Sequence, residues 1–214
     1  MIKPLVTLAD DQLLEINSRT LDAYEERSEQ FWIGTRQHDV GQNIEALLRN
    51  IRSDPPFEIL DFGCGPGRDL LKFSELGHHP TGIDGCAAFV KMAKSYSNCD
   101  VLEQNFLRLK LPNNFFDGIF ANASIFHVPT QELTRVLRQL YCCLKPGGVL
   151  FCSNPRGSDI ERFIDNRYGV FMRWKTWRSY PLNVGFSELE HYYRPQKLPR
   201  NQQPWLASLW RRPN

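Results

Sequence analysis

Long hydrophobic runs are missing from this chain of 214 residues. No apolar stretch is long enough to cross a bilayer, and the N-terminus, M-I-K-P-L-V-T-L-A-D-D, has no usable signal-peptide core. We therefore expect a cytoplasmic protein without a membrane partner. The six cysteines include no C-x-x-C pair and have no metal-binding spacing with the five histidines. We expect reduced, mostly buried thiols, no disulfide framework and no metal site.

A large excess of one charge is also missing, because 26 basic and 24 acidic residues leave a net charge of +2. The charges are unevenly placed: residues 10–30 hold seven acids and two bases, and residues 194–214 hold five bases and no acid. We favour mutual neutralisation of the two ends across the surface. A dedicated nucleic-acid surface normally comes with a pI above about 9. The pI of 8.2 is lower, so nucleic acid is not an expected partner.

The rest of the composition is that of a globular protein, with 42% apolar and 23% charged residues, and the length suits one domain. Strands are predicted by apolar segments at 59–62, 79–84, 101–103, 116–121 and 149–153. Helical spacing predicts helices at 38–52, 68–76 and 89–96, and Thr130 can cap a further one. The apolar positions of that helix are Leu133, Val136, Leu137, Leu140 and Leu144. This alternation predicts right-handed crossovers and a mostly parallel sheet.

A glycine-rich turn after the first strand carries the strongest functional signal. Residues 58–69 read E-I-L-D-F-G-C-G-P-G-R-D, and Asp84 closes the next strand about 20 residues after the first glycine. Glycines let a ligand approach the backbone, and the start of the following helix offers unpaired N–H groups. A carboxylate at the second strand end can accept both hydroxyls of a ribose. The pattern therefore predicts a nucleoside-cofactor site.

The spacing argues against a dinucleotide, because G-x-G-x-x-G would need glycine at position 68, which is arginine. The turn instead resembles motif I of the class I S-adenosylmethionine (SAM) methyltransferases, in the form with Asp61 ahead of the glycines. Three further segments are similar to that family in order and spacing: Gly82–Asp84, Phe116–Ala121 and Leu144–Leu150. The resemblance covers roughly residues 35–155 and is to the small-molecule type, like the ubiquinone- and menaquinone-biosynthesis group.

The resemblance implies a fold and a cofactor. The fold is α/β, a Rossmann-like seven-stranded, mostly parallel sheet with helices on both faces and a C-terminal antiparallel hairpin, for which 189–193 and 205–210 can supply the strands. The cofactor is S-adenosyl-L-methionine, and S-adenosyl-L-homocysteine (SAH) is its product. Within a single domain, 1–214, we expect a lid or cap at 1–37, the SAM-binding core at 38–155, and the substrate-side segment with the hairpin at 156–214.

The same resemblance implies roles around the cofactor. Asp61 would lie near the methionine amino group, the glycines under the sulfonium and ribose, and Asp84 on the ribose hydroxyls. Asn105, in a slot that is often aspartate, can still accept from the adenine amine, and Phe106 packs either on the adenine or in the core. Tyr24 and Trp32 belong to a segment that is either an aromatic lid near the sulfonium or a staple for the first helix. The expected cofactor-binding residues are Asp61, Gly63, Cys64, Gly65, Gly67, Asp84, Gly85, Asn105, Phe106, Asn122, Tyr24 and Trp32.

Methyl transfer from a sulfonium is an in-line displacement, to which alignment of the nucleophile contributes much. A hydroxyl or a protonated amine also needs a general base, and His127, just past the fourth strand, is the catalytic candidate. This histidine can equally orient the substrate or hold the backbone. Ala121–Ser124 lacks the Asn/Asp-Pro-Pro-aromatic run of family members that methylate nucleobases and glutamine, which argues against a planar amide or base amine as acceptor.

Arginines, histidines and tyrosines outside the core favour a small acid as substrate, because arginine forks match carboxylate or phosphate. The expected substrate-binding residues are Arg36, His38, Arg156, Tyr168, His191 and Arg194, and Arg167, Tyr192 and Tyr193 are further candidate site material after the fifth strand. Each arginine alone would more commonly form a surface ion pair. We expect a SAM-dependent methyltransferase acting on a small anionic metabolite, as a monomer or a homodimer. The alternatives are an RNA or protein methyltransferase that uses the basic C-terminal stretch, and a non-catalytic SAM-binding regulator.

Overall fold

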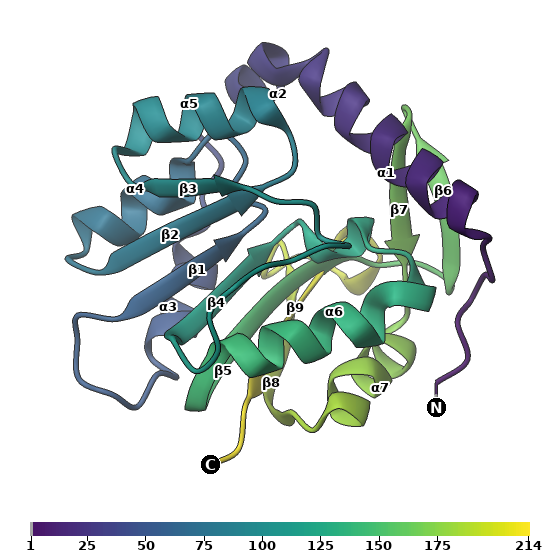
Figure 1. The fold of residues 1–214 in the computed structure, drawn as a ribbon. Coiled ribbons are helices and arrows are strands. Elements are labelled where there is room, and N and C mark those ends of the chain that lie inside the picture. Colours follow the sequence, from purple (N-terminus) through teal and green to yellow (C-terminus); the bar gives the residue numbers. More distant parts are fainter. Residues whose placement is uncertain (1) are drawn as a thin grey trace.

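A computed structural model describes residues 2–214; Met1, the first residue of the expected lid segment, lies outside the described residues. Its centre is a seven-stranded sheet in the order β3-β2-β1-β4-β5-β9-β8 (Figure 1). The strands are β1 (Glu58–Phe62), β2 (His79–Asp84), β3 (Asp100–Glu103), β4 (Phe116–Asn122), β5 (Leu144–Pro155), β8 (Ser187–Arg194) and β9 (Trp205–Arg211). Strands β1 to β5 are parallel, and β9 is antiparallel to β5 and β8. The expected fold, with its C-terminal antiparallel pair, is confirmed.

Helices cover both faces of the sheet because the central strands are apolar on both faces. On one face Ile59 and Phe120 belong to a core that α3 (Gly41–Leu48) and α4 (Arg68–Glu75) complete, with α5 (Ala87–Ser97) packed beside α4. On the other face Leu60 and Ile119 pack with α6 (Thr130–Cys143) and α7 (Trp174–Val184). Within residues 2–214, none of these helices has the length and apolar character needed to cross a membrane.

Two local predictions need correction. The helix expected at 38–52 is shorter, because α3 begins only at Gly41, whose N–H donates to the Asp39 carboxylate, and ends at Leu48. Thr130 does not cap α6: Pro129 occupies the N-cap position, and the Thr130 hydroxyl donates to Glu161 instead. The apolar positions predicted for α6 are buried as expected, although Leu144 already belongs to β5.

Several elements around the sheet were not predicted. They are α1 (Asp10–Glu25), α2 (Ser28–Thr35), α7 (Trp174–Val184), a separate antiparallel pair made of β6 (Ile160–Ile164) and β7 (Arg167–Phe171), and the short turns η1 (Ile125–His127) and η2 (Arg200–Gln202). Helix α1 buries Ile16, Thr20 and Ala23, which share one face at helical spacing. Figure 1 shows α1, in dark purple, running between the α5 side of the molecule and the β6–β7 pair. It therefore passes over the edge of the sheet at which the parallel strands end.

The basic side chains near the C-terminus bind backbone carbonyls rather than the acids of residues 10–30. Arg211 donates to the carbonyls of Gly147 and Asn50, and Arg212 donates to three carbonyls at the end of α6 and the start of β5. Arg194 likewise donates to a backbone carbonyl, that of Asp39. The expected neutralisation of one end of the chain by the other is therefore not what these contacts show, since the arginines tie the last strand to the fold.

Candidate functional site

Two adjoining cavities open at the carboxyl ends of β1 and β4, where the chain leaves the sheet in opposite directions. The inner cavity lies under α1 and opens to solvent at its mouth. The outer cavity lies between α2, the end of β5 and the β6–β7 pair. Both are lined by Tyr24, Phe31, Gly63, Gly65, Ala123 and His127. An elongated ligand can therefore extend from one cavity into the other.

The glycine turn brings the backbone to this junction. Gly63 has φ +79°, and a Cβ on it would lie 2.3 Å from the Cβ of Ser124, so only glycine fits there. Gly67, which has φ +93°, serves another purpose: a Cβ on it would lie 2.8 Å from the Cα of Ala93. Its missing side chain lets α4 pack closely on α5, and Gly67 lies outside both cavities. We expected Gly67 to lie under the cofactor, and the lining of the cavities does not support that position.

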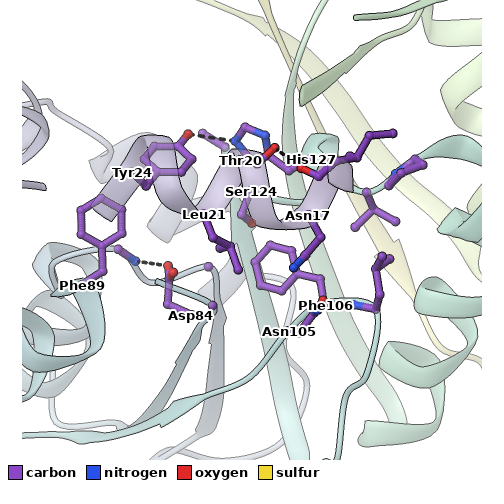
Figure 2. A pocket seen from close by; sticks show the side chains of 18 of the residues that line it. Asn17, Thr20, Leu21, Tyr24, Asp84, Phe89, Asn105, Phe106, Ser124 and His127 are labelled. Carbon is purple, nitrogen blue, oxygen red and sulfur yellow. Dashed lines mark hydrogen bonds between the residues drawn. The ribbon is translucent and has the colours of Figure 1, made fainter. Parts of the chain in front are cut away.

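Asp84 ends β2 at the inner cavity, as predicted. Its Oδ1 accepts the N–H of Cys86 and its Oδ2 accepts the N–H of Gly65, both at 2.9 Å; Figure 2 draws one such bond at Asp84. Burial raises the pKa of this carboxyl to about 6, although the backbone N–H donors favour its ionised form. The carboxylate is thus held in one orientation at the cavity wall, with lone pairs left for hydroxyl donors.

Asn105 and Phe106 reach the inner cavity from the loop after β3 (Figure 2). The side-chain oxygen of Asn105 accepts the N–H of Leu107 at 2.8 Å, so one lone pair is left for a ligand. Phe106 stacks on Phe62 with ring centroids 4.1 Å apart and also lines the cavity. The two roles considered for Phe106, core packing and contact with a flat ligand, are therefore compatible.

Helix α1 forms one wall of the inner cavity. Leu21 packs over Gly85, where a Cβ would lie 2.9 Å from the Leu21 side chain. The Thr20 hydroxyl accepts the N–H of Tyr168 in β7 at 3.0 Å, and Glu25 accepts a backbone N–H at the start of α5. Polar contacts therefore hold α1 at both sides of the cavity. Only a small apolar face of the helix is buried.

Tyr24 and His127 meet where the two cavities join (Figure 2). The Tyr24 hydroxyl lies 2.9 Å from Nε2 of His127, and Nδ1 lies 2.5 Å from the carbonyl oxygen of Tyr168. Because a carbonyl only accepts, Nδ1 carries the proton and Nε2 accepts from the Tyr24 hydroxyl. Burial, together with the nearby Arg167 guanidinium, lowers the pKa of His127 to about 4. The imidazole is therefore neutral near pH 7.

Three polar residues, Arg68, Asp69 and Asn122, line the outer cavity on the side of β1 and α4. Arg68 donates to both carboxylate oxygens of Asp69, at 2.7 and 2.9 Å, and Asn122 donates to the same carboxylate. Asp61 is buried beside them, outside the cavity lining, and Oδ2 of Asp61 has no hydrogen-bond partner anywhere in residues 2–214. Burial raises the pKa of Asp61 well above its ordinary value, and the Asp69 carboxylate adds to the effect. A buried oxygen without a donor is suited to an ammonium group.

Trp32 and Cys64 line the outer cavity, as does Asn122. Of the twelve expected cofactor-binding residues, Asp61 and Gly67 are therefore the two outside the cavity lining, and Asp61 adjoins it. Trp32 also packs edge-on against Tyr96 with centroids 4.7 Å apart, so it both covers the cavity and fastens α2 to α5. The described residues bring no three His, Cys, Asp or Glu side chains together as metal ligands.

The expected substrate-binding residues are only partly brought together. His38 and Arg194 line the outer cavity. Arg36 is exposed just after α2 and lies outside it. Arg156 is turned away, because its guanidinium donates to the carbonyls of Arg200 and Gln203 and so holds the connection between β8 and β9.

Two further expected residues also differ from prediction. His191 lies outside the cavities, stacked on Trp174 with centroids 4.0 Å apart. The hydroxyl of Tyr168 donates to Glu161, also away from the cavities, and it is the backbone carbonyl of Tyr168 that serves the site by fixing His127. Tyr168 therefore positions another residue instead of facing a ligand.

Arg167, which belonged to the candidate site material after the fifth strand, lines the outer cavity, together with three aromatic residues that were not predicted. Arg167 opens β7, and Phe126, Phe171 and Trp205 come from η1, β7 and β9. This grouping could not be predicted from the sequence, because β6 alternates between exposed and half-exposed residues and no strong apolar strand pattern marks the β6–β7 pair. Without that pair, nothing predicted which side of the sheet Arg167 would reach.

Comparison with known proteins agrees with this geometry. Residues 59–148 match the methyltransferase domain family. The trans-aconitate 2-methyltransferase of Enterobacter sp. (strain 638) is 35% identical over 117 residues, which cover 53% of this chain and 45% of that protein. The demethylmenaquinone methyltransferase of Listeria welshimeri is 30% identical over 114 residues, which cover 49% and 48%. The match spans between 26% and 52% of the length of the curated relatives.

A solved structure resembles the whole fold. The 1,6-didemethyltoxoflavin-N1-methyltransferase of Burkholderia thailandensis, with bound 1,6-didemethyltoxoflavin and S-adenosylhomocysteine, has a TM-score of 0.76 and 17% identity. The match covers 100% of this chain and 94% of that chain, and at this identity it concerns the fold. Family match, sheet order and glycine turn agree with one another, and the resemblance seen in the sequence is confirmed. Residues 59–148 match the methyltransferase domain family, and the fold of the whole chain is that of the class I SAM-dependent methyltransferases.

Proposed function

We propose that this chain transfers a methyl group from SAM to a small, anionic metabolite. The observation that carries the proposal is the junction of the two cavities at Tyr24 and His127. A transfer between two ligands needs two adjoining sites that share a wall, and the outer cavity extends past the cofactor residues to the β6–β7 pair, where an acceptor can lie. We also propose the three-part division into a lid at 1–37, a SAM-binding core at 38–155 and a substrate-side segment at 156–214.

The residues around the inner cavity fit SAM. Asp84 would accept the ribose hydroxyls, Phe106 would pack on the adenine, and the remaining lone pair of Asn105 would accept from its amine. The unpaired Oδ2 of Asp61 would receive the ammonium of the methionine part. When bound, SAM supplies a methyl group on a sulfonium, which becomes a neutral thioether once the methyl has gone.

The Tyr24–His127 pair provides a route for a proton. A hydroxyl acceptor that becomes an ether must lose its proton. The Tyr24 oxygen would take that proton while its own hydroxyl hydrogen moves to Nε2 of His127. Nδ1 keeps its proton on the Tyr168 carbonyl throughout, so the ring stays in one orientation. His127 would then act as a base through Tyr24. This differs from the expected direct contact between His127 and the substrate, because the Tyr24 hydroxyl occupies Nε2.

The outer cavity supports an anionic acceptor. Arg167 and Arg194 line it, and His38 lies at its rim. The relatives do not decide the acceptor, since one is named for trans-aconitate, a second for a demethylmenaquinone, and the solved structure holds a didemethyltoxoflavin. No contact of the C-terminal arginines favours RNA or protein, because Arg194, Arg211 and Arg212 donate to backbone carbonyls within residues 2–214.

Transfer of labelled methyl from SAM into a cell extract tests the proposal. After incubation, the extract is separated into small-molecule and macromolecular fractions, and SAH binding is measured in parallel by calorimetry. Label in an anionic small molecule is the expected result. Label in RNA or protein would contradict the substrate class, and tight SAH binding without any label would favour a binding protein.

A further inference from the structure

Arg167 is a cation in the outer cavity that the fold leaves available. It lies 3.8 Å from the carboxylate of Asp165, whose side chain is 64% exposed, so water screens that pair and it contributes little. The guanidinium carbon is 5.4 Å from the ring centroid of Tyr24, at the junction of the two cavities. A ligand that reaches the junction therefore meets the forked donors of Arg167.

The other two arginines in this lining are more fully occupied. Arg68 donates to both oxygens of Asp69 and to the carbonyl of Thr35, which uses its fork. Arg194 donates to the carbonyl of Asp39 and so fastens β8 to the segment before α3. Arg167 is therefore the arginine best placed to bind the anionic group of a ligand with both arms of its fork.

Aromatic rings form the wall beside Arg167. Gly169 lies two residues along β7, and a Cβ on it would lie 3.0 Å from the Phe171 ring and 3.4 Å from the Phe126 ring. The absent side chain lets both rings approach the same stretch of backbone. Phe126 in turn meets Trp205 edge to face, with centroids 6.1 Å apart. Such walls favour a flat, unsaturated ligand over a puckered one of the same size.

We infer that the methyl acceptor is a planar aromatic carboxylate, with its ring against Phe126 and Phe171 and its carboxylate on Arg167. This inference rests on the proposed function and specifies the acceptor of the same site. The carboxylate on Arg167 then lies at the cavity junction, beside the Tyr24–His127 pair. Its binding therefore fixes how the neighbouring ring atoms face the inner cavity. Arg167 is a specificity-determining residue in this arrangement, and proton transfer belongs to Tyr24.

Three simple probes separate charge from planarity. Benzoate, benzamide and cyclohexanecarboxylate are titrated into protein saturated with SAH, and dissociation constants are read from protein NMR shifts. Benzamide keeps the flat ring without the charge, and cyclohexanecarboxylate keeps the charge on a puckered ring. We expect benzoate to bind roughly 10- to 100-fold more tightly than benzamide, the range for losing hydrogen bonds to a charged group. Cyclohexanecarboxylate should bind several-fold more weakly than benzoate.

Substitutions assign the preference to Arg167. Arg167→Gln should abolish the difference between benzoate and benzamide, and Arg167→Lys should keep part of it, since a lysine keeps the charge without the fork. Arg138→Gln is the matched control, because Arg138 is exposed on α6 and outside both cavities. Equal binding of benzoate and benzamide, no binding of benzoate, or a preference that survives Arg167→Gln would each overturn the inference. Failure of SAH to bind would instead overturn the proposed function, and the comparison of probes can still be made without SAH.

Discussion

Burial of a neutral His127 makes the stability of the fold depend on pH. The pKa of this imidazole is about 4 in the folded chain, against about 6.5 when it is unperturbed. Between these values the unfolded chain binds a proton that the folded chain does not, so the free energy of unfolding falls as the pH falls. The contribution is complete above about pH 6.5 and is lost by about pH 4. At 1.36 kcal/mol per pKa unit it amounts to about 3 kcal/mol.

Comparison with His127→Gln isolates this contribution. Glutamine can still accept from the Tyr24 hydroxyl, but it does not titrate. Urea unfolding of both proteins is followed by circular dichroism from pH 7.5 to pH 4, and the difference in unfolding free energy is plotted against pH. The subtraction matters because Asp84 titrates with the opposite sign: its raised pKa of about 6 means that stability is gained as the pH falls through that value. A difference that stays constant with pH would refute a buried, neutral His127.

Three further substitutions test other parts of the site. Asp84→Asn should weaken SAH binding roughly 10- to 100-fold in calorimetry, because the amide loses a charged acceptor; unchanged affinity would place the ribose elsewhere. Gly63→Ala should lower the free energy of unfolding by at least about 1–3 kcal/mol in urea, since the new Cβ meets Ser124 at a positive φ; an unchanged midpoint would contradict the close approach. Tyr24→Phe should lower the free energy of unfolding by about 1 kcal/mol and speed amide hydrogen exchange in α1, because Nε2 of His127 loses its donor. Exchange at the wild-type rates would show that other contacts hold the helix.

The parts of the site that could be predicted are those fixed by backbone over a short stretch of chain. Gly63 had to be glycine because a Cβ would meet Ser124, and the positive φ of Gly65 favours glycine there. Asp84 ends the neighbouring strand because parallel β1 and β2 pair in register. Alternating strands and helices predicted the mostly parallel sheet, and the glycine turn marked the end of its first strand as the place of a nucleoside site. Spacing along the sequence carries this information because each residue is positioned by its own element.

The outer cavity could not be predicted in the same way. Residue type selected Arg156 and His191 as substrate contacts, yet the first is held by two carbonyls and the second by Trp174. Arg167 reaches the cavity because β6 and β7 form a separate pair beside the main sheet. A weakly apolar pair of short strands leaves little trace in the sequence, and which of several arginines faces a ligand depends on which carbonyls occupy the others.

Tyr24 and His127 show what sequence spacing leaves out. They are 103 residues apart, and the sequence suggested separate roles for them, an aromatic lid for one and a base for the other. The structure joins them in one hydrogen bond, so the two roles depend on each other. Tyr24 reaches His127 only while α1 lies over the inner cavity, and the low pKa of His127 results mainly from burial. The same position of α1 therefore covers the inner cavity and keeps the imidazole neutral with Nε2 as an acceptor. A helix displaced from this position would leave His127 exposed to solvent, with a pKa nearer its ordinary value.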